Sequence, residues 1–396
     1  MPSKQRRVAI MLDLEWPYKR HADIFAGTQQ YARQQGWESI IDEFVAENLP
    51  DRRTSSLPYD GVIARASEKL AVRTARLGIP LVNVWYNSPV RNQLPGVFPD
   101  YAAIGRIRAE HLLARGLRRF ASVIREDRGR KLEEAAFQAV VQEAGFSCLT
   151  AKIPLNPSRN HAAWRKTQQR IDAWMRDWRL PIGVSVGDER AGRMVVQRCS
   201  RLGWRVPQDV AIIGGSNEKV LCENPRPSLS STEVGFERIG YQAALLLDQL
   251  MNESEGNRKK ETNAQNILLP PQGLVIREST DFYAVKDELV AAALDFISQN
   301  SHRRIGQDDV SRAVNAETRT LQLRFRKVLD RSIAAEIRRV RIERAKRELA
   351  QSDRRLSDIA RDVGFGKSIR MYEVFRRELG VTPSEYRKQR RLGEEL

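Results

Sequence analysis

Polar and aromatic side chains follow directly after short apolar runs in the first 280 residues. The runs are VAIML (8–12), GVIA (61–64), PLVNV (80–84), FASVI (120–124), IGVSV (182–186) and VAIIG (210–214). Such continuous runs are typical of parallel strands buried on both faces, and ligands bind beyond the carboxyl ends of these strands. Carboxylates and amides pair with vicinal hydroxyls, and an aromatic ring covers the C–H face of a sugar. The candidate ligand-binding residues are Asp13, Trp16, Tyr18, Trp85, Arg125, Asp188, Arg190, Ser216 and Asn217.

Each of these candidates also has a purely structural interpretation. Asp188 precedes a helix pattern and could serve only as its N-terminal cap. The tryptophans could line a cleft or simply be half-buried, and Arg125 could pair with a surface acid. Ser216 could be a turn residue. These alternatives stay open at this point.

A different chemistry is indicated near the other end of the sequence, in LSDIARDVGFGKSIRMYEVFRRELGVTPSEYR (356–387). A weaker copy lies upstream, in which Val310 matches Ile359 at an offset of 49. After the turn the offset becomes 50, so that Phe325 matches Phe375 and one extra residue falls in the second turn. In each copy a short helix, a turn and a second helix are expected. Leu321 with Phe325, and Met371 with Phe375, form the buried stripe of the second helix.

This pattern predicts a pair of helix-turn-helix units that read DNA. The first helix braces on the phosphate backbone and the second offers side chains to base edges in the major groove. Between the copies, AEIRRVRIERAKRELAQS (335–352) predicts one long helix that holds the two units at a fixed separation. Arg326, Lys367 and Arg376 are assigned to phosphate contacts. The residues assigned to base edges are Arg319, Gln322, Arg370, Tyr372 and Glu373. The candidate DNA-binding residues are Arg319, Gln322, Arg326, Lys367, Ser368, Arg370, Tyr372, Glu373 and Arg376.

The charge distribution agrees with a polyanionic partner. The chain of 396 residues has a formal net charge of +17. Residues 285–396 carry 26 Lys+Arg against 18 Asp+Glu, a net +8, whereas the other 284 residues carry a net +9. The C-terminal part is therefore more than twice as basic per residue, which favours DNA contact there.

The elements indicate two domains. In residues 1–280, apolar runs alternate with amphipathic helix patterns, which predicts an α/β architecture of doubly wound parallel sheets in two lobes. Residues 281–396 form the second domain, which is helical throughout from about Val285 onward, with the two helix-turn-helix units at about 307–329 and 356–378. The segment STDFYAVK (279–286) is the expected linker between the domains.

Other classes of site find no support in the sequence. The three cysteines are widely spaced, so no disulfide framework is expected, and the four histidines show no metal-ligand spacing. No phosphate-binding glycine loop, catalytic constellation or membrane span is recognisable. We therefore predict no enzyme activity, no catalytic residue, no cofactor and no metal, and a cytoplasmic protein associated with the nucleoid.

Residues 290–390 resemble the AraC/XylS-type DNA-binding domain. The matches are RIERAKREL (341–349), LSDIARDVGF (356–365) and FRRELGVTPSEYR (375–387). The first copy departs from the family pattern at Glu317 and Asp330, and the second at Ile369 and Met371. The resemblance implies a double helix-turn-helix domain.

Residues 8–278 resemble the sensor domain of LacI/GalR-type regulators, which is periplasmic-binding-protein-like. VPQDVAIIGGSNE (206–218) and PSLSSTEVGFERIGYQAALLLDQL (227–250) look like its C-terminal lobe. YDGVI (59–63), GIPLVNV (78–84) and DYAAIGRIRAEHLLARGLRRFASV (100–123) look like its N-terminal lobe. In that family a small molecule, usually a sugar, binds between the lobes. Asp188 matches a ligand-contacting position of the family, whereas Ser216 stands where an Asp is usual.

A LacI-type sensor fused ahead of an AraC-type DNA-binding domain is the arrangement of the XylR-like regulators, which the chain resembles in order of parts and length. The resemblance implies a homodimeric transcription activator that binds double-stranded DNA, responds to xylose or a related sugar, and works with RNA polymerase. Two alternatives are an α/β sugar-binding or sugar-processing enzyme with a basic helical tail, and a non-specific DNA-packaging protein.

Overall fold

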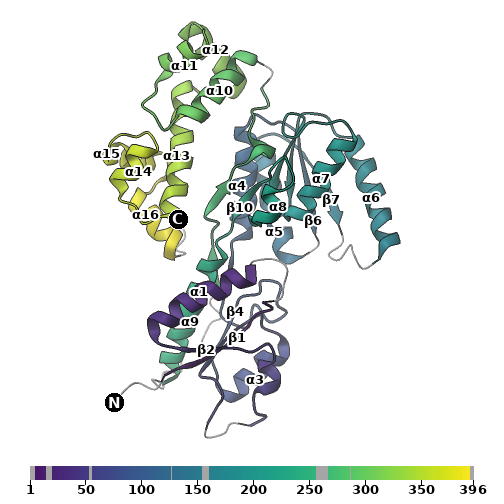
Figure 1. Ribbon diagram of the computed structural model, residues 1–396, viewed down its shortest axis with the longest axis vertical. Helices are drawn as coiled ribbons and strands as arrows, with labels where there is room; N and C mark the ends of the chain where they lie inside the picture. Colours follow the sequence, from purple (N-terminus) through teal and green to yellow (C-terminus); the bar gives the residue numbers. More distant parts are fainter. Residues whose placement is uncertain are drawn as a thin grey trace. The chain divides into compact units, whose positions relative to one another are not determined.

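The computed structural model describes residues 5–14, 20–52, 56–125, 127–153, 160–255, 266–285 and 287–392. The chain divides into two compact units (Figure 1). The first comprises Met1–Asp100, Asp127–Gly129 and Val234–Pro271, and the second comprises Tyr101–Glu126, Arg130–Glu233 and Gln272–Leu396.

The first unit is built on a six-stranded sheet in the order β11-β5-β4-β3-β1-β2, with every strand pair parallel. Its strands are β1 (Arg7–Met11), β2 (Glu38–Ile41), β3 (Gly61–Ala64), β4 (Leu81–Asn83), β5 (Gly96–Pro99) and β11 (Asn266–Leu269). Its helices are α1 (Arg20–Gln35), α2 (Val45–Asn48), α3 (Glu68–Leu77) and α9 (Phe236–Glu255).

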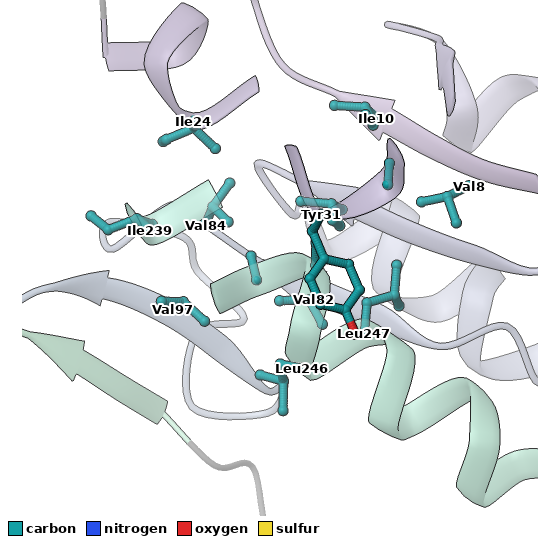
Figure 2. Close-up of a cluster of buried hydrophobic side chains, with 14 of the residues drawn as sticks. Val8, Ile10, Ile24, Tyr31, Val82, Val84, Val97, Ile239, Leu246 and Leu247 are labelled. Carbon is teal, nitrogen blue, oxygen red and sulfur yellow. The ribbon is translucent and has the colours of Figure 1, made fainter. Parts of the chain in front are cut away.

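Helices α1 and α9 lie side by side on this sheet (Figure 1). Figure 2 shows their apolar side chains meeting those of β1, β4 and β5, with Tyr31 among them. The helices approach closely because glycines lie at the crossing. A Cβ on Gly27 would overlap the backbone of Glu237, and a Cβ on Gly240 would overlap that of Ile24.

The second unit holds another six-stranded sheet, in the order β12-β10-β9-β8-β6-β7, in which only the β10–β12 pair is antiparallel among the described strands. Its strands are β6 (Phe120–Arg125), β7 (Cys148–Ile153), β8 (Ile182–Val186), β9 (Val210–Gly214), β10 (Ser230–Glu233) and β12 (Gly273–Val275). Its helices include α4 (Tyr101–Ala114), α5 (Arg128–Glu143), α6 (His161–Arg176), α7 (Glu189–Arg201), α8 (Lys219–Glu223) and the 3₁₀ helix η2 (Glu278–Thr280).

The assignment of residues 100–123 to the N-terminal lobe is wrong. Strand β6 pairs with β7 and β8 of the second sheet, and α4 lies with it in the second compact unit. The chain leaves the first sheet after β5, and the apolar pattern of β6 is the same as that of a strand in either sheet. The beginning of the predicted linker is also built into the second sheet, because Ser279 Oγ donates to the Ile212 carbonyl at 2.6 Å.

The remainder of the second unit is helical. The helices are α10 (Glu288–Asn300), α11 (Gln307–Ala313), α12 (Thr318–Leu329), α13 (Ile333–Gln351), α14 (Leu356–Asp362), α15 (Ser368–Leu379) and α16 (Pro383–Leu392). In Figure 1 the single helix α13 runs between the α10–α12 group and the α14–α16 group. One half of α13 contributes Ile333 and Ile337 to the core of the first group, and the other half contributes Ile342 and Leu349 to the core of the second.

The predicted fold class is confirmed: two parallel-rich sheets are followed by a helical region with two helix-turn-helix units. The turns differ by one residue, as the sequence offsets predict. Four residues separate α11 from α12, and five separate α14 from α15.

Candidate DNA interface and effector-binding residues

The second helices of the two helix-turn-helix units, α12 and α15, each have a buried face and an exposed face. Leu321 and Phe325 of α12, and Met371 and Phe375 of α15, are 0% exposed. This spacing of four places each pair on one stripe of its helix. Tyr386 of α16 packs edge-on against Phe375, with 5.9 Å between ring centroids, and closes the core of the second helix-turn-helix unit.

All predicted DNA-binding residues lie on α12 and α15 or at the N-terminus of α15. Most are exposed, and Lys367 occupies the N-cap position of α15. The exposed members of the set are Arg319, Arg326, Lys367, Arg370, Glu373 and Arg376.

Two predicted base readers are half-buried and bonded to neighbouring helices. Gln322 donates from Nε2 to Oε1 of Gln307 at 2.9 Å, which links α12 to α11. The Tyr372 hydroxyl is bonded to the Ser384 hydroxyl on α16. These bonds orient both side chains, so each must share its polar group with the protein if it also meets a base.

A cluster around Arg341 joins the two helix-turn-helix units. The Arg341 guanidinium donates to the carbonyls of Ser301 and Arg303, each at 2.9 Å. Gly364, in the turn of the second helix-turn-helix unit, packs against the same two groups, because a Cβ there would overlap the Ser301 carbonyl and approach the Arg341 Nε. Burial lowers the pKa of Arg341, and the positive charge of Arg370 lowers it further. The loop before α11 and the turn before α15 are therefore held against each other by α13.

A second cluster joins the helical region to the end of α4. Arg331, which follows α12, donates to the Ala114 carbonyl at 3.0 Å. The Arg115 carbonyl accepts from the Ala284 N–H at 2.7 Å, and the Arg115 guanidinium lies 4.7 Å from the centroid of the Tyr283 ring. We call this cluster of Ala114, Arg115, Tyr283, Arg331 and Glu336 the α4 junction.

Glu336 anchors the α4 junction from within α13. Its side chain is 0% exposed and forms ion pairs with Arg331 at 2.7 Å and Arg339 at 2.6 Å. Burial alone would raise the pKa of Glu336, but hydrogen bonding from Arg339 and the charges of Arg339, Arg331 and Arg115 lower it below its usual value. A buried, doubly paired carboxylate of this kind is costly to disturb.

In the first unit, the strand ends bring together a carboxylate, a guanidinium and an indole. Asp13 follows β1, Arg65 follows β3 and Trp85 follows β4. The Arg65 guanidinium carbon lies 4.8 Å from the centroid of the Trp85 ring, and Asp13 acts electrostatically on Arg65. Burial lowers the pKa of His21 to about 4, although its Nδ1 is bonded to the Asp13 carbonyl at 2.6 Å. His21 is therefore neutral at pH 7.

The buried amide of Asn83 shapes the turn that carries Trp85. Its Oδ1 accepts from the Trp85 N–H at 2.9 Å and from the Ala66 N–H at 3.2 Å. The amide thus ties the end of β4 to the end of β3, and it fixes the backbone on which the Trp85 indole is mounted.

In the second unit, Asp188 is the N-cap of α7, and its Oδ1 accepts from the Ala191 N–H at 2.9 Å. The capping interpretation is thus confirmed, and a role in ligand binding remains a prediction beside it. Arg190, one residue into α7, is exposed.

Glu189 binds the backbone of the neighbouring loop after β9 through hydrogen bonds. Glu189 is only 4% exposed, and its Oε1 accepts from the Ser216 N–H at 2.7 Å and from the Ser231 hydroxyl at 2.9 Å. Asn217 has a positive φ of 60° and is bonded on both sides of its amide, to Arg277 and Glu233 at 2.7 Å each. Asn217 therefore shapes the loop, and the backbone N–H of Ser216 is held by Glu189.

Three predicted ligand-binding side chains fall outside the described part of the chain. Trp16 and Tyr18 lie outside the described residues, and so does the side chain of Arg125, the last residue of β6.

Sequence reasoning missed several residues of these clusters. Arg65 could have been found, because it follows the apolar run GVIA directly, as the other candidates follow theirs. Arg331 and Arg341 carry no local signal, since their partners are 217 and 40 residues away in the sequence. In the described part of the chain no group of three His, Cys, Asp or Glu side chains could hold a metal ion, and no helix is long and apolar enough to cross a membrane.

Comparisons with known proteins agree with this geometry. Residues 109–280 match the periplasmic binding protein-like domain family, and residues 310–389 match a helix-turn-helix domain family. The chain is 27% identical to the xylose operon regulatory protein of Escherichia coli K12 over 98% of each chain. The corresponding protein of Haemophilus influenzae is also 27% identical, over 98% of this chain and 99% of its own.

A solved structure of the xylose-binding transcription activator XylR matches 98% of this chain and 99% of its own, with 25% identity and a TM-score of 0.58. Two DNA-reading helices on one connecting helix, in a chain that also contains a sensor fold, define a transcription regulator rather than an enzyme. The chain is similar over almost its whole length to these xylose operon regulators, with a periplasmic binding protein-like domain ahead of a helix-turn-helix domain.

Proposed function

We propose that this regulator activates transcription at a promoter when a sugar, xylose or a related compound, binds its sensor. The observation that carries the proposal is the α4 junction, which bonds the DNA-binding helices directly to the sensor fold within one compact unit. The protein would act as a homodimer with RNA polymerase in the cytoplasm, at the nucleoid.

The strand-end residues supply the chemistry that sugar recognition needs. Asp13 and Arg65 offer an acceptor and donors for hydroxyls in the first unit, and the Trp85 ring offers an apolar face. In the second unit Asp188, Arg190 and Ser216 lie beyond the carboxyl ends of β8 and β9. We assign effector contacts to these residues. The printed names of similar proteins support a sugar, since the related activator is described as xylose-binding and a LacI-family regulator of Enterococcus faecalis contains bound ribose.

The α4 junction would carry the signal. Helix α4 is 14 residues long, about 21 Å, and it follows β5 of the first sheet in the chain. Its far end is bonded to Arg331, next to the first DNA-reading helix. A change at one end of a rigid helix is delivered to the other end, which is the physical requirement for coupling two sites.

The first experiment is a titration of the protein on its own upstream DNA, at several salt concentrations and with a panel of pentoses and hexoses. A sugar regulator binds one segment specifically, and one sugar changes that affinity about 5–150-fold, the usual range of coupling. Specific binding that no sugar alters would remove the sensor proposal. A loss of affinity with salt on every sequence alike would reduce the protein to a non-specific binder.

Two variants separate sensing from signalling. Asp188→Asn retains the cap of α7, because Asn caps helices as well as Asp, but it removes the carboxylate. We expect it to weaken sugar binding and leave sugar-free DNA binding unchanged. Arg331→Ala should act on the coupling instead: the protein should still bind the sugar, but the sugar should change the DNA affinity less. Transcription in vitro with purified RNA polymerase then distinguishes activation from repression, and sedimentation velocity tests the homodimer.

A further inference from the structure

Two large apolar side chains are exposed on the helices that read DNA. In the described helical region, residues 287–388, the exposed large hydrophobic residues are Leu323 on α12 and Ile369 on α15, each 65% exposed. All other exposed large hydrophobic residues of the described chain lie in the two sheet-containing lobes. In the described helical region, large apolar side chains are thus exposed on the two DNA-binding helices and buried elsewhere.

Both residues lie on the face opposite the buried stripe. On α15, Ile369, Glu373 and Arg376 are spaced by four and three residues, which aligns them on one outer stripe. On α12 the matching positions are Arg319, Leu323 and Arg326.

Folding does not account for this exposure. Neither side chain belongs to the cores of the helical region, which take Leu321, Phe325, Met371 and Phe375 from the same two helices. A single exposed apolar residue is ordinary on a protein surface. Two such residues on the outer stripes of two repeated helices, each with a guanidinium on the same stripe, coincide with the surface that faces the DNA bases.

Thymine supplies the matching chemistry. Its 5-methyl group is the one apolar group that base edges present in the major groove, and protein methyl groups contact it there. Ile369 is the second residue of α15, and the N-terminal residues of such helices reach base edges. The flanking charges on Lys367 and Arg376 favour approach to the phosphates on either side.

We propose that Ile369 and Leu323 each pack against a thymine 5-methyl group, one in each of the two major-groove segments that a protomer reads. This inference rests on the proposed function, and it adds two specificity residues that carry no charge or hydrogen-bonding group. Each reader then combines one apolar contact with the polar contacts of its arginines, so that thymines become fixed positions of the operator.

The test uses operator duplexes in which thymine is replaced by uracil, which removes the methyl group and keeps the base pair. Fluorescence anisotropy gives the affinity of the full-length protein for both duplexes. We expect uracil to weaken wild-type binding about three- to fivefold for each contacted methyl group. Ile369→Ala should be weaker than wild type on thymine DNA, and it should show a smaller further loss on uracil DNA. Leu323→Ala should behave in the same way for the other major-groove segment.

The matched control is Val220→Ala, which removes an equally exposed apolar side chain from α8 of the sensor fold. It should keep the full wild-type sensitivity to uracil. Circular dichroism and thermal unfolding check that the variants fold, as expected for side chains that are 65% exposed. Uracil alters the DNA equally for every variant, so the comparison between variants isolates the contact.

The inference is overturned if Ile369→Ala and Leu323→Ala lose the same factor on uracil DNA as wild type does. It is also overturned if uracil has no effect on wild type while specific binding is intact, and that result leaves the regulator proposal standing. Absence of any specific DNA binding by wild type overturns both. Single thymine-to-uracil changes along the operator then locate the contacted bases.

Discussion

The two helix-turn-helix units have the same interior and different exteriors. Leu321 and Phe325 in one, and Met371 and Phe375 in the other, are completely buried at matching positions. The outer stripes share only their last arginine: Arg319, Leu323 and Arg326 in the first unit become Ile369, Glu373 and Arg376 in the second. Packing geometry constrains the interior of both copies alike, whereas the exteriors are free to differ, and we propose that each fits its own DNA sequence.

The turns and ends of the units differ in how they reach a left-handed backbone. The first unit uses Asn315 at φ 50° and Asp330 at φ 54°, and the second uses Gly364, Gly366 and Gly380 at φ 75–97°. Asn and Asp tolerate this conformation at some cost, whereas Gly adopts it freely. The second unit is therefore the less strained copy, and it is also the copy whose turn packs against Arg341.

The largest effect should come from truncating the matched phenylalanines. Phe325→Ala and Phe375→Ala should each cost about 3–5 kcal/mol of unfolding free energy, because each leaves a cavity in a closed core. Urea unfolding of the two variants measures this. Similar losses support equal interiors, and a difference greater than about 2 kcal/mol would show that one unit repacks more easily.

Gly364→Ala should break the connection between the units. The new methyl group must overlap the Ser301 backbone and also occupy a left-handed conformation, so we expect a loss of about 2–4 kcal/mol. Gly366→Ala is the matched control, because Gly366 has a positive φ of 78° but no atom within 4 Å of the added methyl group. It should cost only about 1–2 kcal/mol. Thermal unfolding compares the two, and equal losses would mean that the Ser301 contact carries no constraint.

Arginine truncations should separate base recognition from phosphate binding. Arg319→Ala and Arg370→Ala should each lower affinity by about 1–3 kcal/mol and relax specificity in one of the two major-groove segments. Arg326→Ala should weaken binding to all sequences alike and lower the salt slope by about 1. Competition binding against randomised half-sites measures both effects. If Arg319→Ala relaxes no position, its assignment to a base is wrong.

The smallest effect is expected at the end of α12. Asp330→Gly should stabilise the first unit by about 0.5 kcal/mol, because Gly relieves the left-handed strain at a small entropic cost in the unfolded chain. Gly380→Asp makes the reverse change in the second unit and should destabilise it. Chemical denaturation of both variants would contradict the comparison if the two changes had the same sign.

Much of the architecture was predictable from local pattern. The helices of the DNA-binding region follow from apolar spacing and repeat offsets, and the buried strands follow from runs such as VAIIG. The position of α4 and β6 was not predictable, because a run such as FASVI has no feature that chooses between two similar sheets. A short strand such as β2, with only two apolar residues, gives too weak a pattern and was also missed.

The candidate sites were predictable only where a local rule applies. The strand-end rule selects Asp13, Trp85 and Asp188, but it gives no sign that Asn217 is bonded on both sides by Arg277 and Glu233. The joining residues Arg331 and Arg341 depend on contacts distant in the sequence. In the sequence both arginines look like any other residue of a basic segment, and only the fold brings their carbonyl partners near.

The α4 junction has a consequence for the sensor itself. If Arg331 and its neighbours transmit the effect of sugar to DNA affinity, the same bonds transmit the effect of DNA to sugar affinity, by the same factor. Operator DNA is then an allosteric ligand of the sensor. A protein molecule on its promoter and one free in solution respond to different sugar concentrations, so the number of operator copies helps to set the threshold of the response.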